Sequence, residues 1–411
     1  MKAEIIAIGS ELLTPTKTDT NSLWLTEKLN DIGIEVMLKT IVGDDRERLE
    51  ETVADAMRRS DIVITTGGLG PTEDDITREC TAKALGRKLI YHDDIEQHLR
   101  ERFRAWGREM PEINKRQAYV IEGAEVLPNP HGSAVGMLAE IEGKLLIVLP
   151  GPPRENQPMF NEHVLPRLRE MAGETYVRRR LLRVSGLGES AVDEIAAPIY
   201  TAYPTVQTSI LFNRSEVEIH VAAHADSEND AQMIADEVAE KLVAALGKAV
   251  FATNGETMEE IVGTLLKTRG ETVAVAESCT GGLIGYRLTE VPGSSAYFLD
   301  GAVTYSNESK IRDLGVEASI IEENGAVSSE CAEAMAEGVR KRSNVVHGIS
   351  VTGIAGPDGG TDEKPVGTVF IGYSGPDGTK SVKLTLPGDR YLIRWRTSQA
   401  ALDYLRRQLL K

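Results

Sequence analysis

The sequence is poor in cysteine, in aromatic residues and in basic charge, and each shortage excludes a class of protein. Three cysteines in 411 residues are too few for a disulfide framework or a cysteine-rich zinc site. Aromatic residues make up 5% of the chain and offer few stacking platforms for single-stranded nucleic acid. Lys and Arg number 46 against 63 Asp and Glu, so the formal net charge of −17 repels nucleic acid and anionic lipid. We therefore expect no nucleic-acid partner.

Long apolar runs are also missing. No stretch approaches the roughly 18 apolar residues of a membrane span, and the N-terminal sequence MKAEIIAIGSELL lacks the layout of a signal peptide. We expect a cytoplasmic protein without membrane contacts. A length of 411 residues exceeds one ordinary domain, and a norm of about 100–200 residues per domain predicts two or three.

The chain contains 38 glycines, and many of them cluster directly after short apolar runs. In residues 1–171 these runs alternate with amphipathic stretches, which predicts a parallel sheet covered by helices on both faces. Residues 255–411 repeat this plan. Residues 174–250 have the order strand, helix, strand, strand, helix, which predicts a small α+β module without visible chemistry. The predicted fold class is α/β, with two three-layer α/β domains of mainly parallel sheets joined by that module.

The glycine turn GGLGPTEDD at residues 67–75 joins a strand end to a helix start. Glycine lets backbone N–H groups approach an anion closely, so we expect Gly67, Gly68 and Gly70 to hold a phosphate. Thr72 can cap the helix that follows, and we expect it at the phosphate with these glycines. The neighbouring acids Asp74 and Asp75 would repel the phosphate unless a divalent metal bridges them. The turn therefore predicts a metal-linked phosphate site.

The turn ESCTGG at residues 277–282 suits amide hydrolysis. A strand delivers Ser278 to a sharp turn, and Thr280, Gly281 and Gly282 open a helix whose N–H groups we expect to stabilise an oxyanion. Cys279 is the rival nucleophile because a thiol is intrinsically more reactive than a hydroxyl. An isolated cysteine, however, more often packs as a small buried residue behind a turn than acts as a nucleophile.

A serine nucleophile needs a base, and no histidine lies near Ser278 in the sequence. The stretch YSNESK at residues 305–310 offers two alternatives, Tyr305 and Lys310. A lysine that is desolvated in a pocket can lose its proton and act as a base. The sequence leaves open which of the two folds against Ser278.

A third turn, TGIAGPDGG at residues 352–360, also follows an apolar run. We expect the backbone N–H groups of Gly353, Ile354, Ala355 and Gly356 to face a nucleotide phosphate. Arg390, at the start of the last helical stretch, is either the cation that balances this phosphate or a solvated surface residue.

Several of these stretches carry a resemblance to a known family. They lie at residues 9–13, 18–21, 66–75 and 150–153 in the first segment, and at 277–282, 305–310 and 353–360 in the third. With the three-segment layout, they resemble the CinA family over essentially the full chain. That family pairs a MoaB/MogA-like molybdopterin-binding domain with a KH-type middle module and a C-terminal nicotinamide mononucleotide deamidase domain of the PncC type.

For the first segment, the resemblance implies an ADP-ribose pyrophosphatase that depends on Mg²⁺, Mn²⁺ or Co²⁺. Asp19 and Asn21 then join the glycine turn at the phosphate, and Asp74 and Asp75 hold the metal. One alternative is a pterin-binding module related to molybdenum cofactor assembly. A second, from a different class, is a competence or DNA-damage accessory protein without hydrolase activity in this domain.

For the third segment, the resemblance implies an amidohydrolase that converts nicotinamide mononucleotide and water to nicotinate mononucleotide and ammonia without a cofactor. Ser278 is then the nucleophile, Tyr305 and Lys310 assist it, and Arg390 faces the phosphate. The resemblance also implies small nucleotide substrates and a homodimer.

Overall fold

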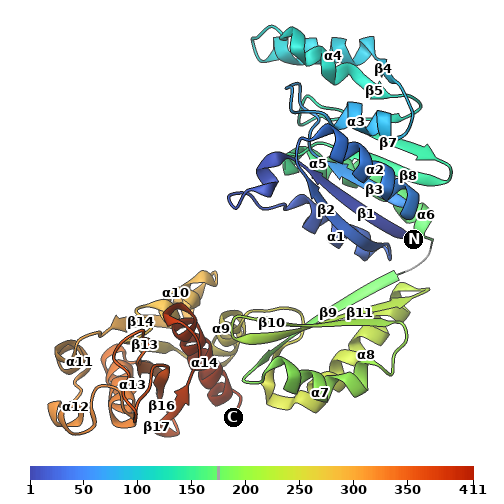
Figure 1. The fold of residues 1–411 in the computed structure, drawn as a ribbon. Coiled ribbons are helices and arrows are strands. Elements are labelled where there is room, and N and C mark those ends of the chain that lie inside the picture. Colours follow the sequence, from blue (N-terminus) through green and yellow to red (C-terminus); the bar gives the residue numbers. More distant parts are fainter. Residues whose placement is uncertain (174–175) are drawn as a thin grey trace. The chain divides into compact units, whose positions relative to one another are not determined.

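The computed structural model describes residues 1–173 and 176–411, and Figure 1 shows the chain coloured from blue at its N-terminus to red at its C-terminus. The chain divides into two compact units, one of residues 1–178 with 224–232 and one of residues 179–223 with 233–411. The expected middle segment begins at residues 174–175, which lie outside the described residues. No described helix has the length and apolar character that a membrane crossing requires.

A six-stranded sheet forms the centre of the first unit, with the strand order β2-β1-β3-β8-β7-β6. The strands β2, β1, β3 and β8 are parallel, whereas β7 and β6 are antiparallel to their neighbours. The bounds are β1 (Lys2–Ile8), β2 (Glu35–Val42), β3 (Ile62–Thr66), β6 (Glu125–Leu127), β7 (Gly136–Ile141) and β8 (Lys144–Leu149). The mainly parallel sheet predicted from the apolar runs is confirmed.

Alternating side chains of β1 explain why helices cover both faces of this sheet. Ile6 packs into one core with α2 (Arg46–Arg59) and α3 (Thr77–Ala84), and Ile5 packs into another with α1 (Asn21–Asp31) and α6 (Leu165–Ala172). The other elements of this domain are η1 (Ser10–Leu13), β4 (Leu89–Tyr91), α4 (Asp93–Ala105), η2 (Glu112–Ala118), β5 (Tyr119–Ile121), α5 (Pro153–Met159) and the π-helical turn η3 (Phe160–Val164).

The middle module has the expected order of strand, helix, strand, strand, helix, with one short strand added. Its sheet has the order β10-β11-β9-β12, and a core of its own packs the sheet against α7 and α8. The elements are β9 (Tyr176–Ser185), α7 (Glu189–Tyr200), β10 (Val206–Asn213), β11 (Glu216–Ala225), α8 (Glu228–Leu246), η4 (Gly247–Ala249) and β12 (Val250–Ala252).

The C-terminal domain contains a five-stranded sheet with the order β14-β13-β15-β16-β17. The strands β14, β13 and β15 are parallel, and β16 and β17 form the expected hairpin. The bounds are β13 (Val273–Glu277), β14 (Phe298–Val303), β15 (His347–Gly353), β16 (Thr368–Gly375) and β17 (Gly378–Thr385). Because parallel strands end at the same edge, the turns that follow β14, β13 and β15 meet there.

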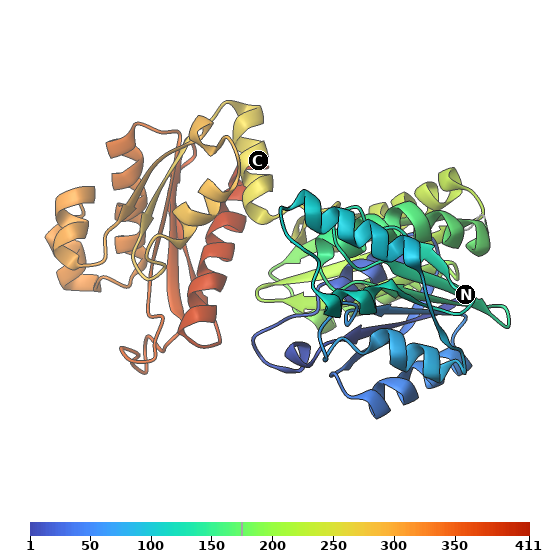
Figure 2. The ribbon, with the colours of Figure 1, turned by 90° about the horizontal axis from the view of Figure 1, so that it is seen from above.

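Helices also cover both faces of this second sheet, as Figure 2 shows. Val275 packs into a core with α9 (Met258–Arg269), α10 (Leu283–Glu290) and α14 (Arg390–Leu409), and Ala276 packs into a core with α11 (Asn307–Leu314) and α13 (Ser329–Ser343). The remaining helices are η5 (Ser294–Ala296) and α12 (Ala318–Asn324). The predicted α/β fold class, with two three-layer domains and a small α+β module, is confirmed.

Candidate functional site

Ser278 lies at the carboxyl edge of the C-terminal sheet, directly after β13. Its backbone N–H donates to the Val351 carbonyl at 3.1 Å, and the Thr304 N–H donates to the Glu277 carbonyl at 2.9 Å. These bonds hold the ends of β15 and β14 against the serine turn. Ser278 is 8% exposed, so a ligand that reached its hydroxyl would be largely shielded from water.

Lys310 lies on α11, the helix that follows β14, and its side chain extends to Ser278. Its Nζ donates to Ser278 Oγ at 3.3 Å, to the Thr304 carbonyl at 2.9 Å and to the Tyr305 carbonyl at 3.2 Å. Lys310 is 1% exposed, and no carboxylate of the described residues forms an ion pair with it. Burial lowers the pKa of Lys310, which favours the neutral amine that a base requires.

Tyr305 has a different place from Lys310. Its side chain is 64% exposed, and its contribution at Ser278 is the backbone carbonyl that accepts from Lys310. Of the two bases that the sequence left open, the structure brings Lys310 to the serine hydroxyl. Cys279 is buried, and burial raises the pKa of its thiol to about 12, which disfavours the reactive thiolate.

The backbone donors of the serine turn differ from those expected. The buried carboxylate of Glu277 accepts the N–H groups of Gly282, Ile284 and Gly285 at 3.0, 3.1 and 2.8 Å, and so caps α10. The Gly281 N–H donates to the Ser278 carbonyl at 3.1 Å. The two expected glycine donors are therefore used within the protein. Within residues 276–282, the N–H groups of Cys279 and Thr280 make no hydrogen bond to a described residue.

Two residues that the sequence did not single out fix this turn. Glu277 is one, and its signal was an acid at the end of an apolar strand, just before a glycine turn. Arg394 on α14 is the other, because its Nη2 donates to the Thr280 carbonyl at 2.7 Å. The Thr280 hydroxyl oxygen is buried and has no hydrogen-bond partner among the described residues. Thr280 thus offers an N–H and a hydroxyl beside Ser278.

The third turn follows β15 and supplies fewer donors than expected. The Ile354 N–H donates to the Thr368 carbonyl at 2.9 Å, and Gly353 belongs to the ladder between β15 and β16. In this turn, the N–H groups of Ala355 and Gly356 have no hydrogen-bond partner in residues 1–173 and 176–411. Arg390 Nη1 donates to the Gly356 carbonyl at 2.6 Å, which places its guanidinium against this turn.

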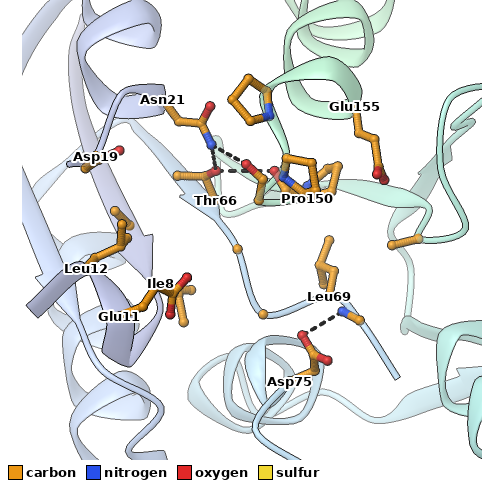
Figure 3. A pocket seen from close by; sticks show the side chains of 18 of the residues that line it. Ile8, Glu11, Leu12, Asp19, Asn21, Thr66, Leu69, Asp75, Pro150 and Glu155 are labelled. Carbon is orange, nitrogen blue, oxygen red and sulfur yellow. Dashed lines mark hydrogen bonds between the residues drawn. The ribbon is translucent and has the colours of Figure 1, made fainter. Parts of the chain in front are cut away.

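The N-terminal domain contains a cavity of about 520 Å³ at the carboxyl ends of β1, β3 and β8. Figure 3 shows Glu11, Asp19, Asp75 and Glu155 around it and Asn21 beside Thr66. Asn21 Nδ2 donates to Thr66 Oγ1 at 2.9 Å and to the Gly151 carbonyl at 2.6 Å, while its Oδ1 is buried without a partner among the described residues. The Asp19 carboxylate accepts the Ser22 N–H at 3.0 Å in the first turn of α1.

The glycine loop lines this cavity, but only part of its backbone faces a ligand. Gly67 has φ of 110°, and a Cβ there would lie 2.2 Å from the Ile8 carbonyl oxygen, so only glycine fits. The N–H groups of Gly67 and Gly70 are bonded to the Leu149 carbonyl and the Asp75 carboxylate. In the loop 67–70 the N–H groups of Gly68 and Leu69 have no partner in the described chain.

The two expected metal ligands lie in different surroundings. Asp75 lines the cavity, but its carboxylate accepts the Gly70 N–H at 2.7 Å and the Thr72 N–H at 2.9 Å, and it also accepts the Thr72 hydroxyl. Asp74 is exposed and lies outside the lining, because the turn that Asp75 closes directs it to solvent. The described residues contain no group of three or more potential metal-binding side chains. Of the two expected ligands, Asp75 alone lines the cavity, and both of its carboxylate oxygens already accept hydrogen bonds.

Arg78 supports the glycine loop from behind and was not predicted. It is 4% exposed, and its guanidinium donates to the carbonyls of Leu69 and Gly70. Burial lowers the pKa of Arg78 to about 10. The N–H groups of Gly68 and Leu69, free among the described residues, belong to the preceding peptide units, whose Gly67 and Gly68 carbonyls accept from the hydroxyl and the N–H of Thr77.

Three families match consecutive parts of the chain. They are described as "Probable molybdopterin binding domain" over residues 4–170, "Damage-inducible protein CinA KH domain" over residues 179–252 and "CinA C-terminal domain" over residues 255–409. A CinA-like protein of Solibacter usitatus is 48% identical over 409 residues, which cover 100% of this chain and 98% of that protein. The chain belongs to the CinA family.

Other members of the CinA family are similarly close. A CinA-like protein of Koribacter versatilis is 49% identical over 414 residues, with 100% of both chains covered. Among solved structures, the competence/damage inducible protein CihA from Agrobacterium tumefaciens is 40% identical, covers 38% of this chain and 94% of its own, and has a TM-score of 0.36.

Proposed function

We propose that the C-terminal domain is an amidohydrolase that converts nicotinamide mononucleotide and water to nicotinate mononucleotide and ammonia. The observation that carries the proposal is the contact of 3.3 Å between Lys310 Nζ and Ser278 Oγ. This lysine is buried without a carboxylate partner among the described residues, and its pKa is lowered. A hydroxyl beside a neutral amine is an activated nucleophile.

The reaction proceeds in two steps. Ser278 Oγ attacks the carboxamide carbon while Lys310 Nζ takes the hydroxyl proton, and the oxygen that becomes negative accepts from the N–H groups of Cys279 and Thr280. Collapse breaks the carbon–nitrogen bond, and the proton on Lys310 passes to the departing ammonia. A water molecule then attacks the acyl ester and gives a proton to Lys310, and Lys310 passes this proton to Ser278 Oγ as the ester bond breaks. The products are nicotinate mononucleotide and ammonia.

The turn after β15 is the place for the phosphate of the substrate. In this turn the N–H groups of Ala355 and Gly356 have no partner among the described residues, and the guanidinium of Arg390 donates to the Gly356 carbonyl. With a net charge of −17 on the chain, an anionic substrate needs such a local positive field. Exchange of Arg390 for Gln should therefore raise KM and leave kcat unchanged.

A product assay on the full chain tests this activity. The protein is incubated with nicotinamide mononucleotide, and ammonia and nicotinate mononucleotide are quantified with and without EDTA. We expect equal amounts of both products and the same rate with EDTA. Absence of ammonia release at any substrate concentration would refute the amidohydrolase proposal.

For the N-terminal domain we propose cleavage of ADP-ribose to AMP and ribose 5-phosphate. The support is the cavity of about 520 Å³ with two unpaired backbone donors at Gly68 and Leu69 and the unpaired Oδ1 of Asn21. A divalent cation, Mg²⁺, Mn²⁺ or Co²⁺, would be held by Asp75 and would neutralise charge on the diphosphate. Asn21 Oδ1 would accept a hydrogen bond from a hydroxyl of the ligand, and the N–H groups of Gly68 and Leu69 would donate to a phosphate oxygen.

Incubation of the full chain with ADP-ribose and each cation tests this second activity, with AMP as the product that is measured. If no cation yields AMP, a binding role remains, and a molybdopterin-type pterin is the alternative ligand. Ligand binding stabilises the folded state, so the ligand that raises the melting temperature distinguishes ADP-ribose from the pterin.

A further inference from the structure

A second cavity, which the proposed reactions do not use, lies between the middle module and the C-terminal domain inside one compact unit. Its volume is about 740 Å³, within the range of about 300–1,000 Å³ that small-molecule sites occupy. The module contributes the loop 185–188 together with Phe212 and Ser215. The domain contributes side chains of β16, β17, the segment after β17 and α14.

Much of the lining is apolar and incompletely covered. Leu187 lies at the edge of the core of the module, and Val382, Leu384 and Leu386 lie at the edge of the core of the domain. These two cores are separate clusters, and the side chains at their facing edges are only partly buried. Phe212 is 48% exposed. A ligand with an apolar body would cover this surface and gain the free energy of its burial.

The polar groups of the lining favour an anion. Arg396 and Arg407 line the cavity together with one acid, Asp403. That acid is already paired with Arg406 at 2.7 Å and with Arg407 at 2.8 Å. Arg396 donates to the carbonyls of Pro387 and Arg214 and has no carboxylate partner among the described residues. The lining therefore carries uncompensated positive charge.

One lining hydroxyl is unpaired among the described residues. Ser215 Oγ is buried and has no hydrogen-bond partner in the part of the chain that the structure describes. A buried polar atom without a partner costs free energy, and a ligand oxygen would satisfy it. The N-terminus of α7, which Gly188 leaves without a side-chain cap, adds partial positive charge at the lining.

We propose that this cavity binds an amphipathic organic anion, whose apolar body packs on Phe212, Leu384 and Leu386 and whose anionic group faces Arg396 and Arg407. The site does not depend on the proposed amidohydrolase activity. The helix α14 connects the cavity to the proposed active site. It lines the cavity and also carries Arg390 and Arg394, which hold the two turns beside Ser278.

Titration of the full-length protein with the aromatic sulfonate 8-anilinonaphthalene-1-sulfonate tests the proposal by fluorescence. We expect saturable binding of one molecule per chain. The variant Leu384→Trp fills the cavity and should weaken binding by about tenfold or more, as should Ala400→Phe from the facing helix. The variant Arg407→Gln leaves Asp403 paired with Arg406 and should also weaken sulfonate binding, by about tenfold for a lost charged hydrogen bond.

The uncharged probe N-phenyl-1-naphthylamine separates charge from apolar contact. Its affinity should fall in Leu384→Trp and stay unchanged in Arg407→Gln. Lys341→Gln, on the exposed face of α13, is the matched control and should bind both probes as the wild type does. Melting curves establish that each variant is folded. Unchanged sulfonate affinity in the folded filling variants, or equal effects of Arg407→Gln on both probes, would overturn the proposal.

The natural ligand is distinguished by displacement of the bound sulfonate. Decanoate represents aliphatic carboxylates and AMP represents nucleotides, and both share the amphipathic anionic character that the cavity requires. If decanoate or AMP displaces the sulfonate from the wild type but not from Leu384→Trp, the class that this compound represents is assigned to the cavity. Displacement that persists unchanged in this variant would place the probe elsewhere and contradict the assignment.

Discussion

The variant Glu277→Ala removes the carboxylate that holds the serine turn. In the wild type this carboxylate accepts three backbone N–H groups at 2.8 to 3.1 Å, from residues 282, 284 and 285. Loss of a helix cap costs about 1 kcal/mol, and an unpaired buried donor costs about 1–3 kcal/mol more. The expected loss is therefore about 3 kcal/mol, which for a domain of about 150–250 residues lowers Tm by about 6–12 °C.

Scanning calorimetry on the full chain measures this change in the transition of the C-terminal domain. Glu277→Gln keeps one acceptor oxygen and should lose less stability than Glu277→Ala. Glu290→Ala removes an exposed acid at the other end of α10 and serves as the matched control, with Tm close to the wild type. A Tm for Glu277→Ala within about 2 °C of the wild type would correspond to a loss of about 1 kcal/mol or less in the free energy of unfolding. That result would refute the view that this cap holds the turn.

Four further predictions concern the two sites. Lys310→Met should lower kcat for deamidation by about 100- to 10,000-fold, the range for loss of a general base, whereas Lys267→Met on the exposed side of α9 should not; equal rates in both variants would remove Lys310 from the reaction. Burial lowers the pKa of Lys310 in the folded protein. Between that pKa and the ordinary lysine pKa of about 10.4, the unfolded chain therefore binds more protons than the folded one. The contribution of Lys310 to the free energy of unfolding consequently rises with pH across that window. Urea unfolding should show this rise in the wild type and not in Lys310→Met. Arg390→Gln should raise KM at unchanged kcat, and an altered kcat alone would place Arg390 outside the phosphate site. Asp75→Ala frees the N–H groups of Gly70 and Thr72, so the stabilisation of the full chain by ADP-ribose should disappear in a thermal melt; retained stabilisation would contradict the role of this loop.

Much of the fold could be predicted from local pattern. Apolar runs that lead into glycine-containing turns, such as IVITT before Gly67 and VAVAE before Ser278, are strands buried on both faces in the structure. The small pair β4 and β5 escaped prediction, because three-residue strands such as LIY are too short to show a periodicity.

The candidate site could be predicted only in part, for a physical reason. The sequence shows which turns carry glycine, but not which N–H groups remain unpaired after folding. Gly282 donates to Glu277, and Ile354 donates to Thr368, so only part of each expected donor set is left unpaired among the described residues. The choice between Tyr305 and Lys310 likewise depends on side-chain direction, which a helix cap at Ser306 and the start of α11 determine.

A comparison of Ser278→Ala with Cys279→Ala in the full-length protein tests whether Ser278 is the nucleophile. Ammonia released from nicotinamide mononucleotide is quantified at saturating substrate, and melting curves establish that both variants are folded. We predict that Ser278→Ala abolishes ammonia release and that Cys279→Ala keeps most of it, because the backbone N–H of residue 279 is retained and its thiol is not used. The reverse pattern, with activity kept in Ser278→Ala and lost in Cys279→Ala, would contradict the serine and lysine pair as the centre of the reaction.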